Sequence, residues 1–122
     1  MSFSISVIAE AQWTQLNTGV QVQLKSVYFI NVNTGWACGL NTIIKTTNGG
    51  LSWQATALPG FHKSMDFKDE LTGYVCGEYG KVHKTTDAGN NWYSLNTGFN
   101  VTLNQIRIAE DGSVIIPGNS ST

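Results

Sequence analysis

The stretch SVYFINVNTGWACG at residues 26–39 aligns without gaps with SMDFKDELTGYVCG at residues 64–77. After one inserted residue the similarity resumes between KTTNGGLSW at 45–53 and KTTDAGNNW at 84–92. A third copy is visible where WTQLNTGVQVQLKSV at 13–27 matches WYSLNTGFNVTLNQI at 92–106. Tryptophan therefore recurs at positions 13, 53 and 92, at intervals of 40 and 39 residues. A fixed period of this length is typical of repeat architectures, in which each repeat is one supersecondary unit.

Within each repeat the apolar residues alternate with polar ones, as in Val27 and Phe29 or Met65 and Phe67. This is the period of a β-strand with one buried face, and no stretch shows a helical period. Turn residues divide the first repeat into four strands, which we place at 26–31, 35–40, 42–47 and 51–58. Four short antiparallel strands in about 40 residues are typical of a β-propeller blade. We therefore predict an all-β domain over 1–122, with three four-stranded units at about 26–63, 64–102, and 103–122 completed by 1–25.

The third unit is predicted to be divided between the two ends of the chain. Residues 103–108 and 112–118 read as its first two strands, and Phe3–Ala9 and Gln12–Leu16 read as its third and fourth. If three blades form an open arc, the shared blade has to form between neighbouring molecules, since closure pairs the exposed strand edges. The expected partner is therefore a second copy of the chain, in a homodimer with a six-bladed ring. A nine-bladed trimer, or a piece of a longer propeller protein, remains open.

Two of the repeats resemble the Asp-box, or BNR repeat, whose pattern is Ser/Thr, any residue, Asp/Asn, any residue, Gly, any residue, Ser/Thr, Trp. Together with the preceding GWACG and GYVCG segments, they look most like the repeats of the photosystem II stability and assembly factor family. The resemblance implies a protein-binding scaffold and a structural box that stabilises a hairpin at the blade periphery. Asn91 departs from the pattern, because Ser or Thr is usual there. The box residues are Thr46, Asn48, Gly50, Ser52 and Trp53 in one copy, and Thr85, Asp87, Gly89 and Trp92 in the other.

Composition argues against several classes of function. A formal net charge of -1 gives no electrostatic basis for binding nucleic acid, which depends on clustered Lys and Arg. The apolar runs are far shorter than the roughly 20 residues of a membrane span. No basic region followed by an apolar one opens the sequence, so no secretory signal is visible and the localisation stays open.

We expect neither a catalytic site nor a metal or other cofactor. Cys38 and Cys76 occupy equivalent positions in two repeats, too far apart to bridge, and are expected to be buried free thiols. His62 and His83 occupy non-equivalent positions without other ligands at metal-site spacing. Sialidases share these repeats, but the resemblance implies three arginines around their substrate, and Arg107 is the only arginine of the chain. A sialidase-like glycoside hydrolase is therefore the less favoured alternative.

The expected function is a non-catalytic binding or scaffold module that mediates protein–protein interaction; an oligomeric carbohydrate-binding lectin is the alternative. Its partner, apart from the chain itself, is an unidentified protein or glycan. Equivalent positions of the innermost strands carry Tyr28, Asp66 and Arg107, which line a central channel or else are solvated positions or an inter-blade ion pair. Exposed aromatic, amide and carboxylate groups suit sugar or peptide recognition. On the face formed by the loops between blades and between second and third strands, these candidates are Asn41, Phe61, His62, Glu78, Tyr79 and Phe99.

Overall fold

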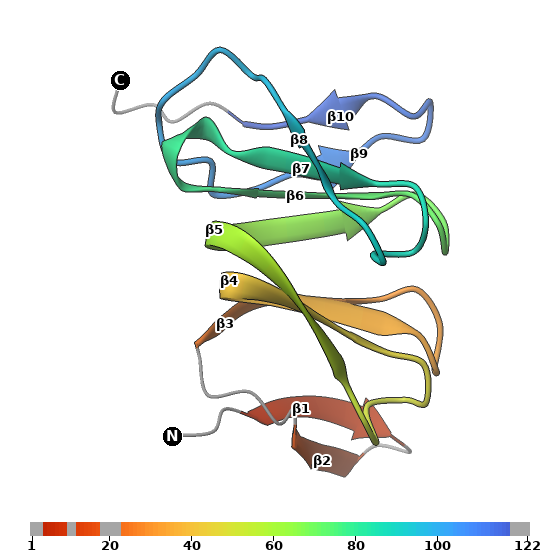
Figure 1. Cartoon of the computed structure of the whole chain (residues 1–122). Helices are drawn as coiled ribbons and strands as arrows, with labels where there is room; N and C mark the ends of the chain where they lie inside the picture. Colours follow the sequence, from red (N-terminus) through yellow and green to blue (C-terminus); the bar gives the residue numbers. More distant parts are fainter. Residues whose placement is uncertain (1–3, 10–11, 18–22, 118–122) are drawn as a thin grey trace.

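The computed structural model describes residues 4–9, 12–17 and 23–117. These residues form ten β-strands and one turn of 3-10 helix (Figure 1). No helix among them is long and apolar enough to cross a membrane. The elements are β1 (Ser4–Ala9), β2 (Gln12–Asn17), β3 (Leu24–Phe29), β4 (Gly35–Thr46), β5 (Gln54–Phe67), β6 (Gly73–Gly77), η1 (Glu78–Gly80), β7 (Val82–Thr85), β8 (Tyr93–Leu95), β9 (Arg107–Ile108) and β10 (Val114–Ile115).

Six strands form one antiparallel sheet in the order β3-β4-β5-β6-β7-β8. The separate second and third strands predicted for the first repeat are joined in β4, with a register shift between Leu40 and Thr42. Asn41 lies at this shift with a φ of 58°, a left-handed conformation that Asn tolerates better than most residues. In the second repeat the equivalent position is a true break, because η1 separates β6 from β7.

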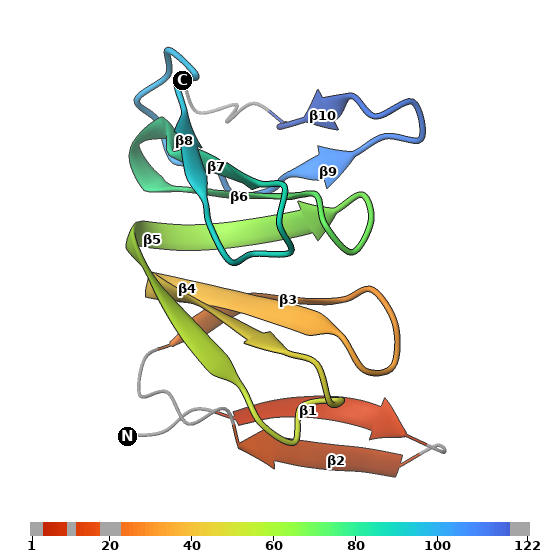
Figure 2. The ribbon, with the colours of Figure 1, turned by 45° about the vertical axis from the view of Figure 1, so that its right-hand side comes forward.

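Strand β5 crosses from the first repeat into the second. Its first half pairs with β4 and its second half pairs with β6, while the chain bends sharply at Gly60, where φ is 126° (Figure 2). The predicted strand at 51–58 therefore begins later, at Gln54, because residues 47–53 form the turn of the Asp-box. It also runs on without interruption into the predicted first strand of the next repeat.

The third repeat contains less strand than the sequence predicts. The strands expected at 103–108 and 112–118 are reduced to β9 and β10, which pair as a two-stranded sheet. The reason is that residues 103–106 bond to the second repeat instead of a partner strand. The amide of Leu103 donates to the carbonyl of Gly77 at 2.9 Å, and the amide of Ile106 donates to the Ser64 hydroxyl at 3.3 Å.

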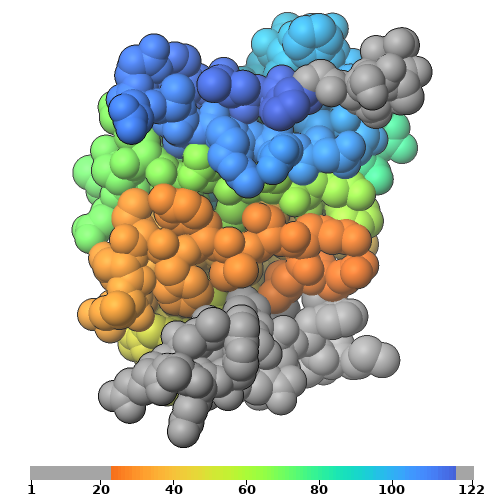
Figure 3. Space-filling model, turned by 180° about the vertical axis from the view of Figure 1, so that it is seen from behind, coloured from red at the N-terminus to blue at the C-terminus, as the bar shows by residue number. Residues whose placement is uncertain are grey.

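The apolar cores lie between successive repeats. The largest core lies between the first and second repeats. It contains Trp36, whose ring stacks on that of Phe67 with 3.7 Å between the ring centroids. Trp36 is completely buried between the first and second repeats. A second core, made of Cys76, Val82, Leu103 and Ile106, joins the second repeat to the third. Seen from behind, segments of the three repeats follow one another along one face (Figure 3).

Strands β1 and β2 form an antiparallel hairpin, as predicted, in which Ser4 pairs with Asn17 and Ala9 with Gln12. The hairpin lies at one end of the molecule, and β9 and β10 lie at the other (Figures 1 and 2). Within one chain, therefore, it does not lie beside the third repeat. The side chain of Trp13, predicted to match Trp53 and Trp92, falls outside the described residues.

Candidate functional site

The first Asp-box forms a closed network of hydrogen bonds. The Thr46 hydroxyl donates to Asn48 Oδ1 at 2.9 Å and accepts from the Gly50 amide at 2.9 Å. Asn48 also holds the far side of the turn, where its Oδ1 accepts from the Ser52 amide and its Nδ2 donates to the Ser52 hydroxyl. The turn ends where Trp53 Nε1 donates to the Gly50 carbonyl at 3.0 Å. These contacts hold the side chains of Thr46, Asn48 and Trp53 within the turn.

The second Asp-box reproduces the Thr and Asx contacts of this network, in spite of its departure from the pattern, but lacks the tryptophan bond. Both the amide and the side-chain amide of Asn91 donate to the Asp87 carboxylate, at 2.9 and 2.8 Å. Asn91 thus takes the place of Ser52 with the side-chain bond reversed, since the Ser52 hydroxyl accepts from Asn48 whereas Asn91 Nδ2 donates to Asp87. These bonds and that from the Thr85 hydroxyl hold the pKa of Asp87 below its usual range, because they favour the charged form.

The innermost strands are tied together by the residues that were candidates for a channel lining. The Tyr28 hydroxyl donates to the Phe67 carbonyl at 3.2 Å, and the Asp66 carboxylate accepts from the Ile108 amide at 2.8 Å. Each side chain thus bonds to the backbone of the next repeat along the chain. The Arg107 guanidinium donates to the carbonyl of the preceding residue, Ile106, at 2.8 Å.

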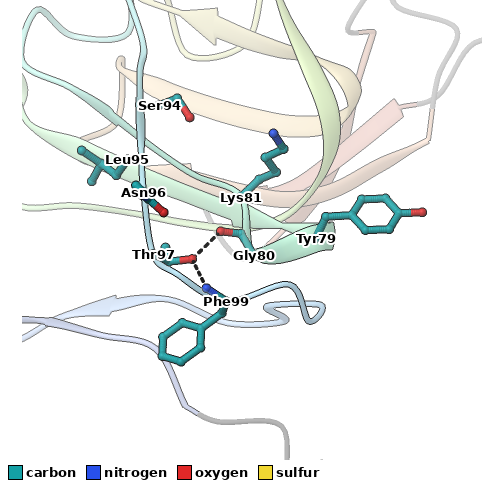
Figure 4. Close-up of a pocket in the computed structure, with 8 residues that line it drawn as sticks. All are labelled: Tyr79, Gly80, Lys81, Ser94, Leu95, Asn96, Thr97 and Phe99. Atoms are coloured by element: carbon teal, nitrogen blue, oxygen red, sulfur yellow. Dashed lines mark hydrogen bonds between the residues drawn. The ribbon is translucent and has the colours of Figure 1, made fainter.

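Two of the predicted ligand residues, Tyr79 and Phe99, lie in the wall of one cleft of about 320 Å³. Both are about two-thirds exposed. Thr97 fixes the centre of the cleft, since its hydroxyl donates to the Gly80 carbonyl at 2.9 Å and accepts from the Phe99 amide at 3.1 Å (Figure 4). From this contact the two rings point in different directions, so they flank the cleft without touching each other (Figure 4). Its walls are Tyr79, Gly80, Lys81, Ser94, Leu95, Asn96, Thr97 and Phe99.

The other predicted loop residues lie outside the wall of this cleft. Asn41 Oδ1 accepts from the Gly60 amide at 2.9 Å, so its side chain fixes the bend of β5. The ring of Phe61 is half-buried and lies beneath two ammonium groups, those of Lys63 at 4.6 Å and Lys25 at 5.5 Å from its centroid. Glu78 is half-buried at the start of η1.

His62 and His83 contact each other, which their spacing in the sequence did not predict. Both are buried, and their rings meet edge to face with centroids 5.6 Å apart. Because the Leu58 carbonyl can only accept, the 2.8 Å contact to His62 Nε2 places the proton of that ring on Nε2. The Nδ1 atoms of both rings are buried without a hydrogen-bond partner. Burial lowers the pKa of His62, and burial, with His62 and Lys81 nearby, lowers the pKa of His83 to about 4.

The two cysteines are buried free thiols, as expected. Burial raises the pKa of Cys38 to about 12 and that of Cys76 to about 11, which makes both poor nucleophiles at neutral pH. Within residues 4–9, 12–17 and 23–117, no three His, Cys, Asp or Glu side chains are grouped closely enough to hold a metal ion.

The sequence did not single out Lys81, Leu95 or Thr97 as members of the site. Leu95 lies on β8, the last strand of the six-stranded sheet, and Thr97 follows it. The only signal for Thr97 was its place in the repeated Asn-Thr-Gly segment at 96–98, which also occurs at 17–19. Leu95 and Thr97 lie beside η1 because the chain folds back after β8, and no local sequence pattern predicts the path of that loop.

Three comparisons with known proteins bear on this arrangement. The family model described as Photosynthesis system II assembly factor YCF48 matches residues 5–108. A solved structure described as YCF48 bound to D1 peptide superposes with a TM-score of 0.70 at 24% sequence identity, and covers 81% of this chain and 35% of that one. The chain therefore spans about a third of the length of that protein, whose fold it shares over the matched part. The search of curated proteins found no match.

Proposed function

Because the chain belongs to the Photosynthesis system II assembly factor YCF48 family, we propose that it is a non-catalytic module that binds a segment of another protein. Fold alone does not determine function, so the proposal depends on a site. The observation that carries it is the open cleft beside η1, where Tyr79 and Phe99 expose most of their surface. Exposed aromatic side chains next to hydroxyl and amide groups are typical of protein-binding surfaces.

The neighbouring strand supports an extended ligand. Strand β8 ends the six-stranded sheet, and all three of its residues are exposed. Ser94 and Leu95 of this strand also line the cleft. An extended peptide adds to an exposed strand edge through backbone hydrogen bonds while its side chains enter adjacent pockets. The solved structure described as YCF48 bound to D1 peptide makes D1 the first candidate for such a ligand.

The test is a fluorescence anisotropy titration with overlapping labelled peptides that cover the D1 sequence. We expect one or a few peptides to bind, and Tyr79→Ala and Phe99→Ala each to weaken binding by about fivefold or more, the loss of ~1 kcal/mol that marks a contributing interface aromatic. Leu71→Ala is the control, because Leu71 is an exposed apolar residue outside both the cleft wall and β8. If Leu71→Ala weakens binding as much as the cleft variants, the proposed site is wrong. Binding to a glycan array that requires Tyr79 and Phe99 would instead favour the lectin.

We also propose that the β1–β2 hairpin of one copy completes the third repeat of another copy. Its support is the match of residues 13–27 to 92–106, which makes the hairpin equivalent to the later strands of a repeat. Two-stranded sheets are marginal by themselves, and both β1–β2 and β9–β10 are two-stranded. Pairing between copies joins them into one four-stranded unit.

A further inference from the structure

Carboxylates predominate in the turns at one end of the molecule, and lysines predominate at the other. Four further charged residues lie in strands: Lys45 and Lys84 directly precede the two Asp-boxes on β4 and β7, and Asp66 and Arg107 lie on β5 and β9. One end, here called the turn end, holds the turns that follow first strands and the two Asp-box turns. Backbone bonds link these turns to each other, from the Gly49 amide to the Asn33 carbonyl and from the Ala88 amide to the Leu71 carbonyl, both at 2.9 Å. Of the ionisable groups in these turns, one is a cation, Lys68, and five are carboxylates: Asp69, Glu70, Asp87, Glu110 and Asp111.

The opposite end, here called the loop end, comprises the bulge at Asn41, the bend at Gly60, η1 and residues 96–103. It holds three lysines, Lys25, Lys63 and Lys81, and among the described residues one carboxylate, Glu78. The cleft with Tyr79 and Phe99 opens at this end.

The three lysines form a connected series. Lys25 and Lys63 share the ring of Phe61, within 5.5 Å of its centroid. Lys63 follows His62, which pairs with Gly77, and the Gly77 amide donates to the carbonyl of Lys81. Lys63 and Lys81 therefore lie on either side of β6, about 10 Å apart, which is two strand spacings. Lys81 itself is part of the cleft wall.

We propose that the loop end binds an acidic, extended polypeptide segment, whose carboxylates lie against Lys25, Lys63 and Lys81 and whose apolar side chain enters the cleft. This inference rests on the proposed protein-binding function and specifies the chemistry of the partner. Three ammonium groups in series repel one another in the free protein, and an anionic segment relieves that repulsion. The carboxylates of the turn end repel the same segment, so charge complementarity also selects which end it meets.

The test uses three labelled peptides of equal length, about 12 residues, each with the same two apolar residues. The remaining positions are Glu and Asp in the first peptide, Gln and Asn in the second, and Lys in the third. We expect the acidic peptide to bind most tightly and to lose affinity several-fold between about 50 and about 200 mM salt, as screening of exposed charges requires. The double variant Lys63→Gln with Lys81→Gln should weaken its binding about threefold to tenfold, the loss of two exposed ion pairs.

Lys68→Gln is the matched control, since it removes an exposed lysine from the turn end; it should leave the affinity for the acidic peptide unchanged. Thermal melting of each variant establishes that it is folded. If the neutral peptide binds as tightly as the acidic one and the double variant binds both normally, the inference fails while the proposed function stands. If no peptide of any composition binds, both fail. Two results would show that the protein attracts polyanions in general and would overturn the site. One is an equal loss of affinity for the acidic peptide in Lys68→Gln and in the double variant. The other is tight binding of heparin that does not depend on Tyr79 and Phe99.

Discussion

Trp53 and Trp92 occupy equivalent positions in two repeats but differ in one hydrogen bond. Trp53 Nε1 donates to the carbonyl of the buried residue Gly50, whereas Trp92 Nε1 is buried without a hydrogen-bond partner. Phenylalanine keeps most of the ring and removes the N–H. We expect Trp53→Phe to lower the free energy of unfolding by about 1 kcal/mol more than Trp92→Phe does, because only the first leaves a buried carbonyl unpaired. Urea denaturation of the two variants measures the difference; equal losses would contradict it.

The His62–His83 pair predicts a loss of stability in mild acid. The pKa of His83 is lowered to about 4 in the folded protein, while an unfolded histidine titrates near 6.5. Between these pH values the unfolded chain binds a proton that the folded protein does not, so the free energy of unfolding falls as the pH falls from about 6.5 to about 4. The carboxylates with lowered pKa values, Asp69, Asp87 and Asp111, lose their contribution only at lower pH.

Urea denaturation at pH values between 4 and 7 tests this expectation, with His83→Leu as the comparison. The variant cannot be protonated at that position, so its stability should change less with pH over the same range. A pH dependence equal to that of the natural chain would show that His83 does not titrate as its burial requires.

At the scale of residues, local sequence is enough to predict the contacts of the box residues, whereas the ligand residues stay a prediction. The roles of Asn48 and Asp87 follow from local turn chemistry, and the structure confirms them. Asn91 departs from the pattern, yet it bonds to Asp87 at the position where Ser52 bonds to Asn48. The contact between His62 and His83 joins different strands through the sheet register, and residue spacing alone does not reveal that register.

At the scale of elements, the second Asp-box turn restricts what can replace Gly89. Its φ is 87°, and an added Cβ would lie 2.9 Å from Nε1 of Trp36, which donates to the Ala88 carbonyl of the same turn. Trp36 is fully buried against Phe67 and has no space to move. Gly89→Ala therefore combines the strain of a left-handed alanine with overpacking, at a cost of about 2 to 5 kcal/mol.

Gly98→Ala is the matched control for this turn. Gly98 has a φ of 76°, and nothing lies within 4 Å of an added Cβ. Gly98→Ala should lower the free energy of unfolding only by the backbone strain of a left-handed alanine, about 1 to 2 kcal/mol. Thermal melting of both variants compares them, and a similar fall in melting temperature would mean that Trp36 yields to the added methyl group.

Alternation of apolar residues predicted where strands lie but not where they end. The merger of two predicted strands in β4 depends on Asn41 adopting a positive φ within a bulge instead of a turn. The shortening of the third repeat has a different cause, since the amides of Leu103 and Ile106 bond to the second repeat. A strand pattern contains neither the backbone conformation of one residue nor a hydrogen bond to another repeat.

At the scale of the whole molecule, the proposed exchange of the β1–β2 hairpin predicts an obligate assembly. Pairing of β1–β2 with β9–β10 of another copy should give a particle of ~27 kDa as a dimer or ~40 kDa as a trimer of the 13.3 kDa chain. Stability should then rise with protein concentration. Analytical ultracentrifugation at low micromolar concentration measures the mass, and a folded monomer would rule out the exchange.

A deletion of residues 1–12 supplies the second arm of this test. It removes β1 and the start of β2, so the completed unit cannot form, and we expect aggregation or unfolding. A deletion variant that stays folded with the mass of the full-length assembly would show that the hairpin is not the connecting element.

The continuity of β5 has a mechanical consequence. A single strand pairs with β4 over its first half and with β6 over its second. A stretching force that passes from the first repeat to the second must therefore travel along β5, parallel to the strand, and load the hydrogen bonds of both ladders in shear. Bonds loaded in shear share the force and break together, whereas bonds peeled from one end break in turn. The first two repeats should consequently resist extension as one mechanical element, with a single rupture force and no separate yielding of either repeat.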